Sequence, residues 1–265
     1  MHRTTLGDIE ISALIDLVQA YGAAGVYSEA GDALQRYADL LDAEGKVTLN
    51  FACFLLRADG RTVLVDAGNG PEAEGRLLEE LAAAGVAASD VDAVLFTHLH
   101  GDHTGWNLDR DSGQPRFPNA RYLVPRGDWD HYRAQDPPPT SFVRDVLPLD
   151  ALGVMDLVAG EYAITPSLVT WHTPGHTPGH LSVVAKSGGV EAYVIGDALL
   201  TPIDVAEPDW VTTWDWDAEH VRATRRAILE RVEASGALIA ASHLPVPGLG
   251  HLAIEGGRRV WKPLG

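Results

Sequence analysis

Four short apolar segments of the chain each end in a histidine or an aspartate. They are VDAVLFTH (91–98), SLVTWHTPGH (167–176), EAYVIGD (191–197) and ALIAASH (237–243). Short apolar runs of this kind are typical of buried strands, and helical patterns alternate with them. In the clearest of these, residues 217–235, Val221, Ile228 and Val232 share one face and Gly236 can end the helix. Strands that alternate with helices predict an α/β fold, with binding sites at the C-terminal edge of the strands.

The other segments favour hairpins and one further helix. Residues 4–16 alternate loosely, as in an early strand or hairpin, and the apolar runs on either side of 58–60 indicate a second hairpin. Residues 72–88 have helical spacing, and the tail predicts a hairpin that turns at Gly256-Gly257. Because no linker-like segment divides the chain, we expect a single domain over residues 1–265. Residues 17–45 could form a flap or lid.

The amino-acid composition indicates which binding partners and which cellular compartment to expect. The 265 residues are 46% apolar, enough for a large core, and 37 acidic against 20 basic residues give a formal net charge of −17. Such a chain repels phosphate backbones, so we expect no nucleic-acid partner. The lone Cys53 excludes an internal disulfide framework, and we find neither a leader-like segment nor a membrane-spanning run. We therefore expect a soluble cytoplasmic protein without a membrane partner, and the sequence leaves a homodimer open.

The segment THLHGDH (97–103) concentrates four metal-binding side chains in six positions. In an extended segment His98 and His100 point to the same side, because side chains alternate with period two. Gly101 then lets the chain turn, so that Asp102 and His103 can face a neighbouring point. One loop could thus serve two adjacent cations, and imidazole and carboxylate ligands suit zinc, iron or manganese. A surface histidine cluster is the alternative, which the preceding buried strand disfavours.

These blocks resemble the metallo-β-lactamase superfamily, most of all its methyl-parathion-hydrolase-like and acyl-homoserine-lactone-lactonase-like branch. The resemblance rests on VLVDAG (63–68), THLHGDH (97–103), TPGHTPGH (173–180), IGDAL (195–199) and SHLPVPGLGH (242–251), which occur in the family's order. It implies a four-layer αβ/βα sandwich of two facing mixed sheets with helices outside. It also implies seven metal ligands: His98, His100 and His176 for one ion, Asp102, His103 and His243 for the other, and Asp197 between them.

The resemblance also implies roles around the two ions, most readily Zn²⁺, with iron or manganese as alternatives. Asp102 and Asp197 are the expected catalytic carboxylates beside a metal-bridging hydroxide. Asp66 is the expected partner that orients a ligand, although an aspartate that caps a turn is equally consistent with its position. Of the neighbours of His176, we expect His172 to pack or face solvent and His180 to support the site from behind.

Two metal ions with such ligands can hydrolyse several kinds of substrate, so the sequence predicts the type of reaction, hydrolysis, and leaves the substrate open. We expect a hydrolase of a small apolar ester, lactone or phosphotriester. Asp197 and the lack of a leader disfavour a true β-lactamase, and the net charge disfavours a nuclease. A glyoxalase-II-like thioesterase is an alternative, although no basic residue follows Asp197 in ALLTPIDVAEPDW. The lactonase pattern places a tyrosine three residues after that aspartate, where this chain has Leu200. A non-hydrolytic di-metal redox or binding protein also stays open.

A small-molecule substrate of this kind needs a largely apolar pocket. The candidates for its wall surround the metal-binding blocks, and a position in the core is at least as consistent with each aromatic residue. They are Phe54, Trp106, Trp129, His131, Leu199, Leu200 and Pro202.

Overall fold

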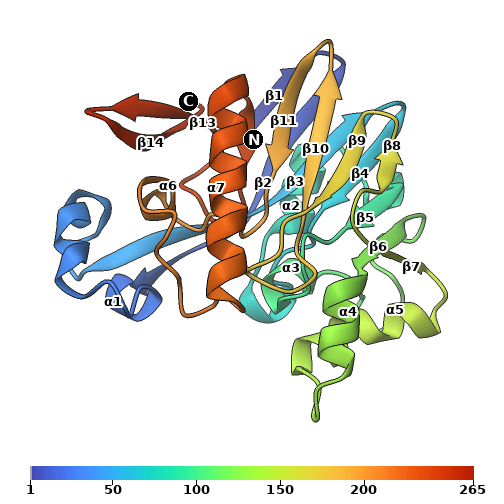
Figure 1. Ribbon diagram of the computed structural model, residues 1–265. Coiled ribbons are helices and arrows are strands. Elements are labelled where there is room, and N and C mark those ends of the chain that lie inside the picture. The colour runs from blue at the N-terminus through green and yellow to red at the C-terminus, as the bar shows by residue number, and fades with distance from the viewer. Residues whose placement is uncertain (1) are drawn as a thin grey trace.

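Two seven-stranded sheets face each other in the computed structural model, which describes residues 2–265 (Figure 1). The first half of the chain builds one sheet, in which the strands lie side by side in chain order. The pairs from its first to its fourth strand are antiparallel, and the pairs from the fourth to the seventh are parallel, so the sheet is mixed. The strands are β1 (His2–Leu6), β2 (Ile9–Gly22), β3 (Lys46–Ala58), β4 (Arg61–Val65), β5 (Ala93–Leu95), β6 (Arg121–Pro125) and β7 (Met155–Val158).

The second half of the chain builds the other sheet, again in chain order. All of its pairs are antiparallel except β11 with β12, which are parallel. Its strands are β8 (Ala163–Thr165), β9 (Leu168–His172), β10 (Leu181–Ser187), β11 (Val190–Val194), β12 (Leu238–Ala240), β13 (Leu249–Glu255) and β14 (Arg258–Pro263).

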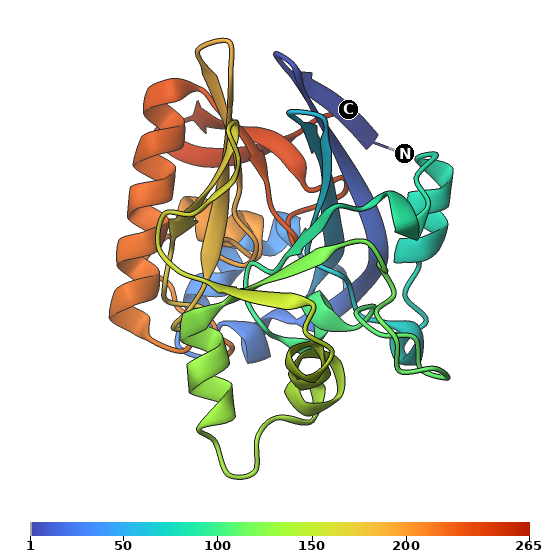
Figure 2. The ribbon, with the colours of Figure 1, turned by 90° about the vertical axis from the view of Figure 1, so that its right-hand side faces the viewer.

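Helices cover the outer faces of both sheets, which gives the predicted four layers (Figure 2). Side chains of one hydrophobic cluster fill the space between the sheets, for example Phe54 and Val183. A second cluster joins the first sheet to its helices, and a third joins the second sheet to α7. The helices are α1 (Ala23–Val26), α2 (Leu77–Ala83), α3 (Gly101–Thr104), α4 (Arg126–Arg133), α5 (Leu147–Ala151), α6 (Pro202–Ala206) and α7 (Ala218–Ser235), with short 3₁₀ or π turns at Gly31–Leu40, Pro71–Ala73, Ala88–Asp90 and Phe142–Val146.

Local signals explain the best-predicted elements. The β3–β4 hairpin turns on Asp59 and Gly60, whose φ angles of 54° and 73° fit the two-residue turn that matches strand twist. Asp217 caps α7 by accepting a hydrogen bond from the backbone of His220 at 2.8 Å, and Gly236 ends it at φ 64°. These two elements are confirmed, as is the β13–β14 hairpin. The helix expected over 72–88 is shorter, because only Leu77–Ala83 is α-helical.

The segment 17–45 continues strand β2 to Gly22 and then folds into α1 and the 3₁₀ turns of Gly31–Leu40. Its side chains Tyr27, Leu34 and Tyr37 pack with Ile203 into a fourth hydrophobic cluster. The segment is thus docked on the region that follows β11, and its action as a lid stays a prediction. Among residues 2–265 there is no helix both long and apolar enough to span a membrane.

Candidate metal centre

The predicted ligands gather at one edge of the sandwich, where strands of both sheets end. His98, His100, Asp102 and His103 follow β5, and the last two lie in the short helix α3. The second sheet supplies the other three from the ends of β9, β11 and β12, namely His176, Asp197 and His243. The pattern of apolar strands that end in histidine or aspartate therefore describes this edge correctly, since C-terminal strand ends are where such sites form.

The seven side chains form two groups that share Asp197. The first group consists of His98, His100, His176 and Asp197. In it His100 Nδ1 lies 3.0 Å from His98 Nε2 and 3.1 Å from His176 Nε2. Asp197 Oδ2 lies 3.2 Å from His176 Nε2 and 3.7 Å from His98 Nε2. Nitrogens bound at about 2.0–2.1 Å to a tetrahedral zinc ion lie roughly 3.3 Å apart, so this spacing fits one cation.

The second group consists of Asp102, His103, Asp197 and His243. Asp102 Oδ2 lies 3.5 Å from the Nε2 atoms of both His103 and His243. Asp197 Oδ1 lies 3.2 Å from His103 Nε2, whereas its Oδ2 lies 3.0 Å from His243 Nε2. One carboxylate thus faces both groups, which is the position that a bridging ligand requires.

Two buried polar atoms at the centre lack a hydrogen-bond partner among the described residues. His103 Nε2 and Asp197 Oδ1 are buried and have no hydrogen-bond partner among residues 2–265. A buried polar atom without a partner costs about 1–3 kcal/mol, so these two atoms, which lie 3.2 Å apart, would be stabilised by a bound ion or water molecule. A divalent cation between them would satisfy both, and the donor set of imidazoles and carboxylates is one that zinc, iron or manganese accepts.

Charge and burial shift the pKa values of these groups in opposite directions. Burial lowers the pKa of His100 to about 4. Burial also opposes protonation of His243, but the charges and hydrogen bonds of Asp197 and Asp102 outweigh it and raise its pKa to about 10. Although burial alone would raise the pKa of Asp197, the surrounding histidines, His243 foremost, hold it well below its usual range. The carboxylates thus favour positive charge on the imidazoles around them, and a bound divalent cation would supply that charge in place of the ring protons.

Asp66 lies where the sequence analysis expected an orienting partner. Its carboxylate accepts hydrogen bonds from Thr97 N at 2.7 Å, from Thr97 Oγ1 at 2.8 Å and from His103 Nδ1 at 2.8 Å. The bond to Nδ1 fixes the tautomer in which His103 Nε2 carries a free lone pair for a metal. Asp66 reaches this position with a φ of 65°, in the left-handed region that aspartate tolerates better than most residues.

His180 and His172 lie as the repeat TPGHTPGH suggested. His180 is buried and stands 2.9 Å from Thr173 Oγ1 through Nδ1, while its Nε2 accepts the backbone N–H of Asp197 at 3.2 Å. Burial lowers the pKa of His180 to about 3, in keeping with a neutral ring that accepts this bond. His180 therefore holds the backbone of Asp197, whereas the exposed ring of His172 lies 3.2 Å from Pro178 O.

Two supporting contacts escaped the sequence analysis. Asp215 Oδ1 lies 3.0 Å from His176 Nδ1, and Asn50 O lies 2.6 Å from His243 Nδ1. Asp215 follows no strand pattern, and a backbone carbonyl has no sequence signal. A further aspartate, Asp128 on α4, accepts hydrogen bonds from Leu99 N at 3.0 Å and Gly179 N at 2.6 Å. It thus connects the loop that carries His98 and His100 with the loop that follows His176.

A cavity of about 500 Å³ opens onto both groups. Metal-group side chains form its floor, and apolar or aromatic side chains form much of its wall. Among the described residues that line it there is no lysine or arginine. The wall comprises Tyr21, Leu49, Phe51, Asn69, Gly101, Leu200 and Trp214.

Of the side chains expected to line a pocket, Leu200 does so and the others lie elsewhere. Phe54 faces the space between the sheets, because it shares strand parity with Ala52 and Leu56. Leu199 packs in the cluster under α7. Trp106 and Trp129 are buried in the cluster outside the first sheet, and Pro202 begins α6. The half-buried His131 lies on α4, with its Nε2 3.1 Å from Nε2 of Gln135 beyond the end of that helix.

The sequence matches a family model described as the metallo-beta-lactamase superfamily over residues 52–243. An N-acyl homoserine lactonase of Bacillus sp is 28% identical over 171 residues, which are 56% of this chain and 61% of that protein. The N-acyl homoserine lactonase AiiA of Bacillus thuringiensis subsp. kurstaki is 26% identical over the same shares. The chain thus spans about three fifths of the length of these curated relatives.

Two solved structures resemble the fold over its whole length. A hydrolase of the beta lactamase superfamily, AbOPH, has a TM-score of 0.86 at 25% identity and covers 100% of this chain and 97% of its own. AidC, a dizinc quorum-quenching lactonase in complex with a product, also has a TM-score of 0.86, at 22% identity over the same shares. At that identity the likeness to AidC concerns the fold.

Proposed function

The chain belongs to the metallo-beta-lactamase superfamily, and from this premise we propose that it is a two-metal hydrolase of small apolar lactones. One observation carries the proposal: two ligand groups share Asp197 and open together into a cavity with an apolar wall. Two adjacent cations beside a substrate cavity are the arrangement that two-metal hydrolysis requires. The lactonase relatives supply the substrate class, and the cavity supplies the reason to favour an apolar member of it.

Each side chain at the site has a distinct part in this proposal. His98, His100 and His176 would hold one divalent cation, and Asp102, His103 and His243 the other, with Asp197 between them. The chemistry that two bound cations supply is activation of water near neutral pH and polarisation of the substrate carbonyl. Asp102 lines the cavity and its side chain is partly exposed, so it can also orient a water molecule beside the substrate.

The cavity wall explains why the substrate should be uncharged and apolar. Leu49, Phe51, Leu200 and Trp214 can bury an acyl chain, at about 25 cal/mol for each Å² of apolar surface removed from water. No lysine or arginine lines the cavity among the described residues, so a substrate carboxylate away from the metal ions would meet no cationic side chain of the wall. This composition disfavours the thioesterase alternative that binds an anionic thiol.

Tyr21 is the one phenol among the described lining residues, and it comes from the segment 17–45. Burial and the nearby charge of Asp102 raise the pKa of Tyr21, so the phenol keeps its proton near neutral pH. It can then donate a hydrogen bond to an oxygen of the substrate. The position of Leu200, which carries no hydroxyl, therefore does not deprive the site of a donor.

Metal analysis with a substrate panel tests the proposal. We expect about two metal ions per chain and hydrolysis of lactones with acyl chains, ahead of esters, phosphotriesters and thioesters. The variant Asp197→Asn should lose metal and activity. The control variant Asp150→Asn, at an exposed position, should change neither. Full activity with one metal per chain, or in Asp197→Asn, would contradict the two-metal mechanism. A preference for thioesters or phosphotriesters would contradict the substrate class alone.

A further inference from the structure

Arg225 is a fully buried arginine on α7 and the largest of the completely buried side chains. Its Nε donates to Ala198 O at 2.9 Å, and its Nη1 donates to Trp210 O. Its Nη2 donates to Asp215 Oδ2 at 3.2 Å, and Nη1 lies 3.4 Å from Asp204 Oδ1. A buried guanidinium is costly unless it is paired and hydrogen-bonded, and here two buried carboxylates and two carbonyls share it.

One branch of these contacts leads to the metal centre. Asp215 uses Oδ1 for His176 Nδ1, at 3.0 Å, and Oδ2 for Arg225. The same Oδ2 accepts hydrogen bonds from Thr212 N and Oγ1, at 2.8 and 2.9 Å. Arg225 thus holds the back of the carboxylate whose front orients a ligand of the first group.

The other branch leads to the cavity wall and to the segment 17–45. Asp204 Oδ2 accepts the backbone N–H groups of Leu200 and Thr201, at 2.7 and 2.9 Å. Asp204 Oδ1 accepts the hydroxyl of Tyr27 at 2.8 Å. The Ala198 carbonyl that Arg225 binds belongs to the residue next to Asp197.

We propose that Arg225 is a positioning residue for the first metal, acting through Asp215 on His176, a ligand of the first group alone. This inference rests on the proposed two-metal function. Partners behind a ligating histidine fix its ring and its tautomer, and their loss typically lowers metal affinity 10–100-fold. Arg225 extends that support by one layer. If Arg225 were merely structural, its replacement would lower the stability of the fold and would not weaken one metal site of the folded protein more than the other.

Zinc competition with a chelator measures both dissociation constants in each folded variant. Variants His176→Ala and His243→Ala identify which constant belongs to which group. We expect Arg225→Lys, which keeps the charge and loses the planar fork, to weaken the first site at least tenfold and the second less than threefold. Asp215→Asn should weaken the first site as well, and the double variant should resemble Asp215→Asn alone, because both changes act on one contact.

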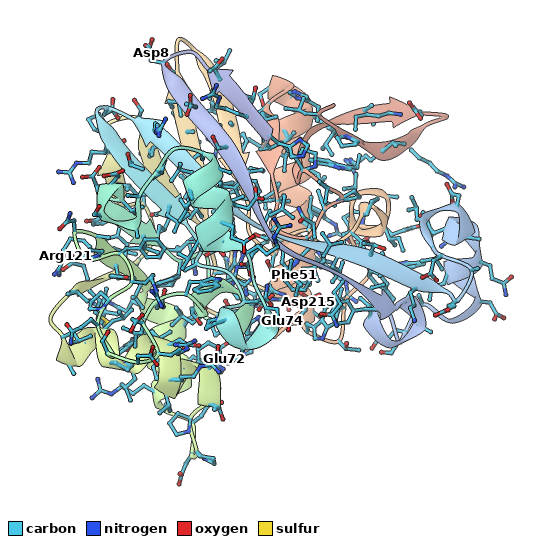
Figure 3. The ribbon with its side chains drawn as sticks, turned by 180° about the vertical axis from the view of Figure 1, so that it is seen from behind. Asp8, Phe51, Glu72, Glu74, Arg121 and Asp215 are labelled. Atoms are coloured by element: carbon cyan, nitrogen blue, oxygen red, sulfur yellow. The ribbon has the colours of Figure 1, made fainter. Side chains whose placement is uncertain are left out.

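Controls separate this inference from the function on which it rests. Arg121→Lys is the matched control, since Arg121 also binds a carboxylate and two carbonyls, at the far end of β6 (Figure 3). If Arg225→Lys fails to fold, Asp204→Asn replaces it, because it weakens the hold on Arg225 without touching Asp215. Equal changes at both sites, or none, would overturn the positioning role while the wild type still binds two zinc ions. Fewer than two ions in the wild type would overturn the two-metal function as well.

Discussion

Asp66→Asn should weaken the second metal site by imposing the wrong tautomer on His103. One carboxylate oxygen accepts Thr97 N at 2.7 Å, and the other accepts both Thr97 Oγ1 and His103 Nδ1 at 2.8 Å. Asparagine keeps the size and tolerates the φ of 65°, but it can accept with only one atom. If its oxygen keeps Thr97 N, its amide faces Nδ1, and the ring proton must move to Nε2, the metal-facing atom.

The expected magnitude follows from the loss of one such partner. A 10–100-fold fall in affinity at the second site corresponds to roughly 1.4–2.8 kcal/mol. Zinc competition with a chelator measures it, and the thermal unfolding of the metal-free protein shows whether the fold is intact. Asp59→Asn is the matched control: Asp59 also has a positive φ, of 54°, but binds Ser167 at a hairpin tip away from the site. Unchanged zinc affinity in Asp66→Asn would refute the tautomer argument.

Three further results are expected. Gly175→Ala should lose the first metal, because its Cβ would lie 2.4 Å from the backbone of Val221 and displace His176; metal content near two would contradict this. Leu229→Ala, at a fully buried position of α7, should lower the free energy of unfolding in urea by about 2–5 kcal/mol; a change below about 1 kcal/mol would mean that α7 packs more loosely on the sheet. A chelator should lower the melting temperature and zinc should restore it, because each bound ion adds about 2.7 kcal/mol of stability when free zinc is 100 times its Kd; an unchanged melting temperature would contradict linkage.

The metal groups could be predicted because each ligand lies in a pattern. THLHGDH follows a buried strand, and IGD and SH each end one, so a single rule about strand ends places them at one edge. The resemblance then supplied the pairing of ligands into two groups. The resemblance also supplied the four layers, whereas the alternation of strands and helices and the caps of α7 are local properties that the sequence itself predicts.

The cavity wall could not be predicted, because it depends on parity and on docking. Phe51 and Phe54 lie on the same strand, three residues apart, and therefore face opposite sides of the sheet; only Phe51 reaches the cavity. Tyr21 and Trp214 come from segments far apart in the chain, and their rings meet edge to face at 5.5 Å. Asp215 contacts the site only because the fold brings it behind His176, 39 residues earlier in the chain.

The order of the strands gives the metals a part in holding the molecule together. Each half of the chain makes one whole sheet, and each ligand group draws two residues from either half: His98 and His100 meet His176 and Asp197, while the other group is divided in the same way. Neither half alone possesses a full set of donors. The complete centre can therefore form only after the two sheets have docked. Two bound cations would then cross-link the two halves of the chain at the edge where strands of both sheets end.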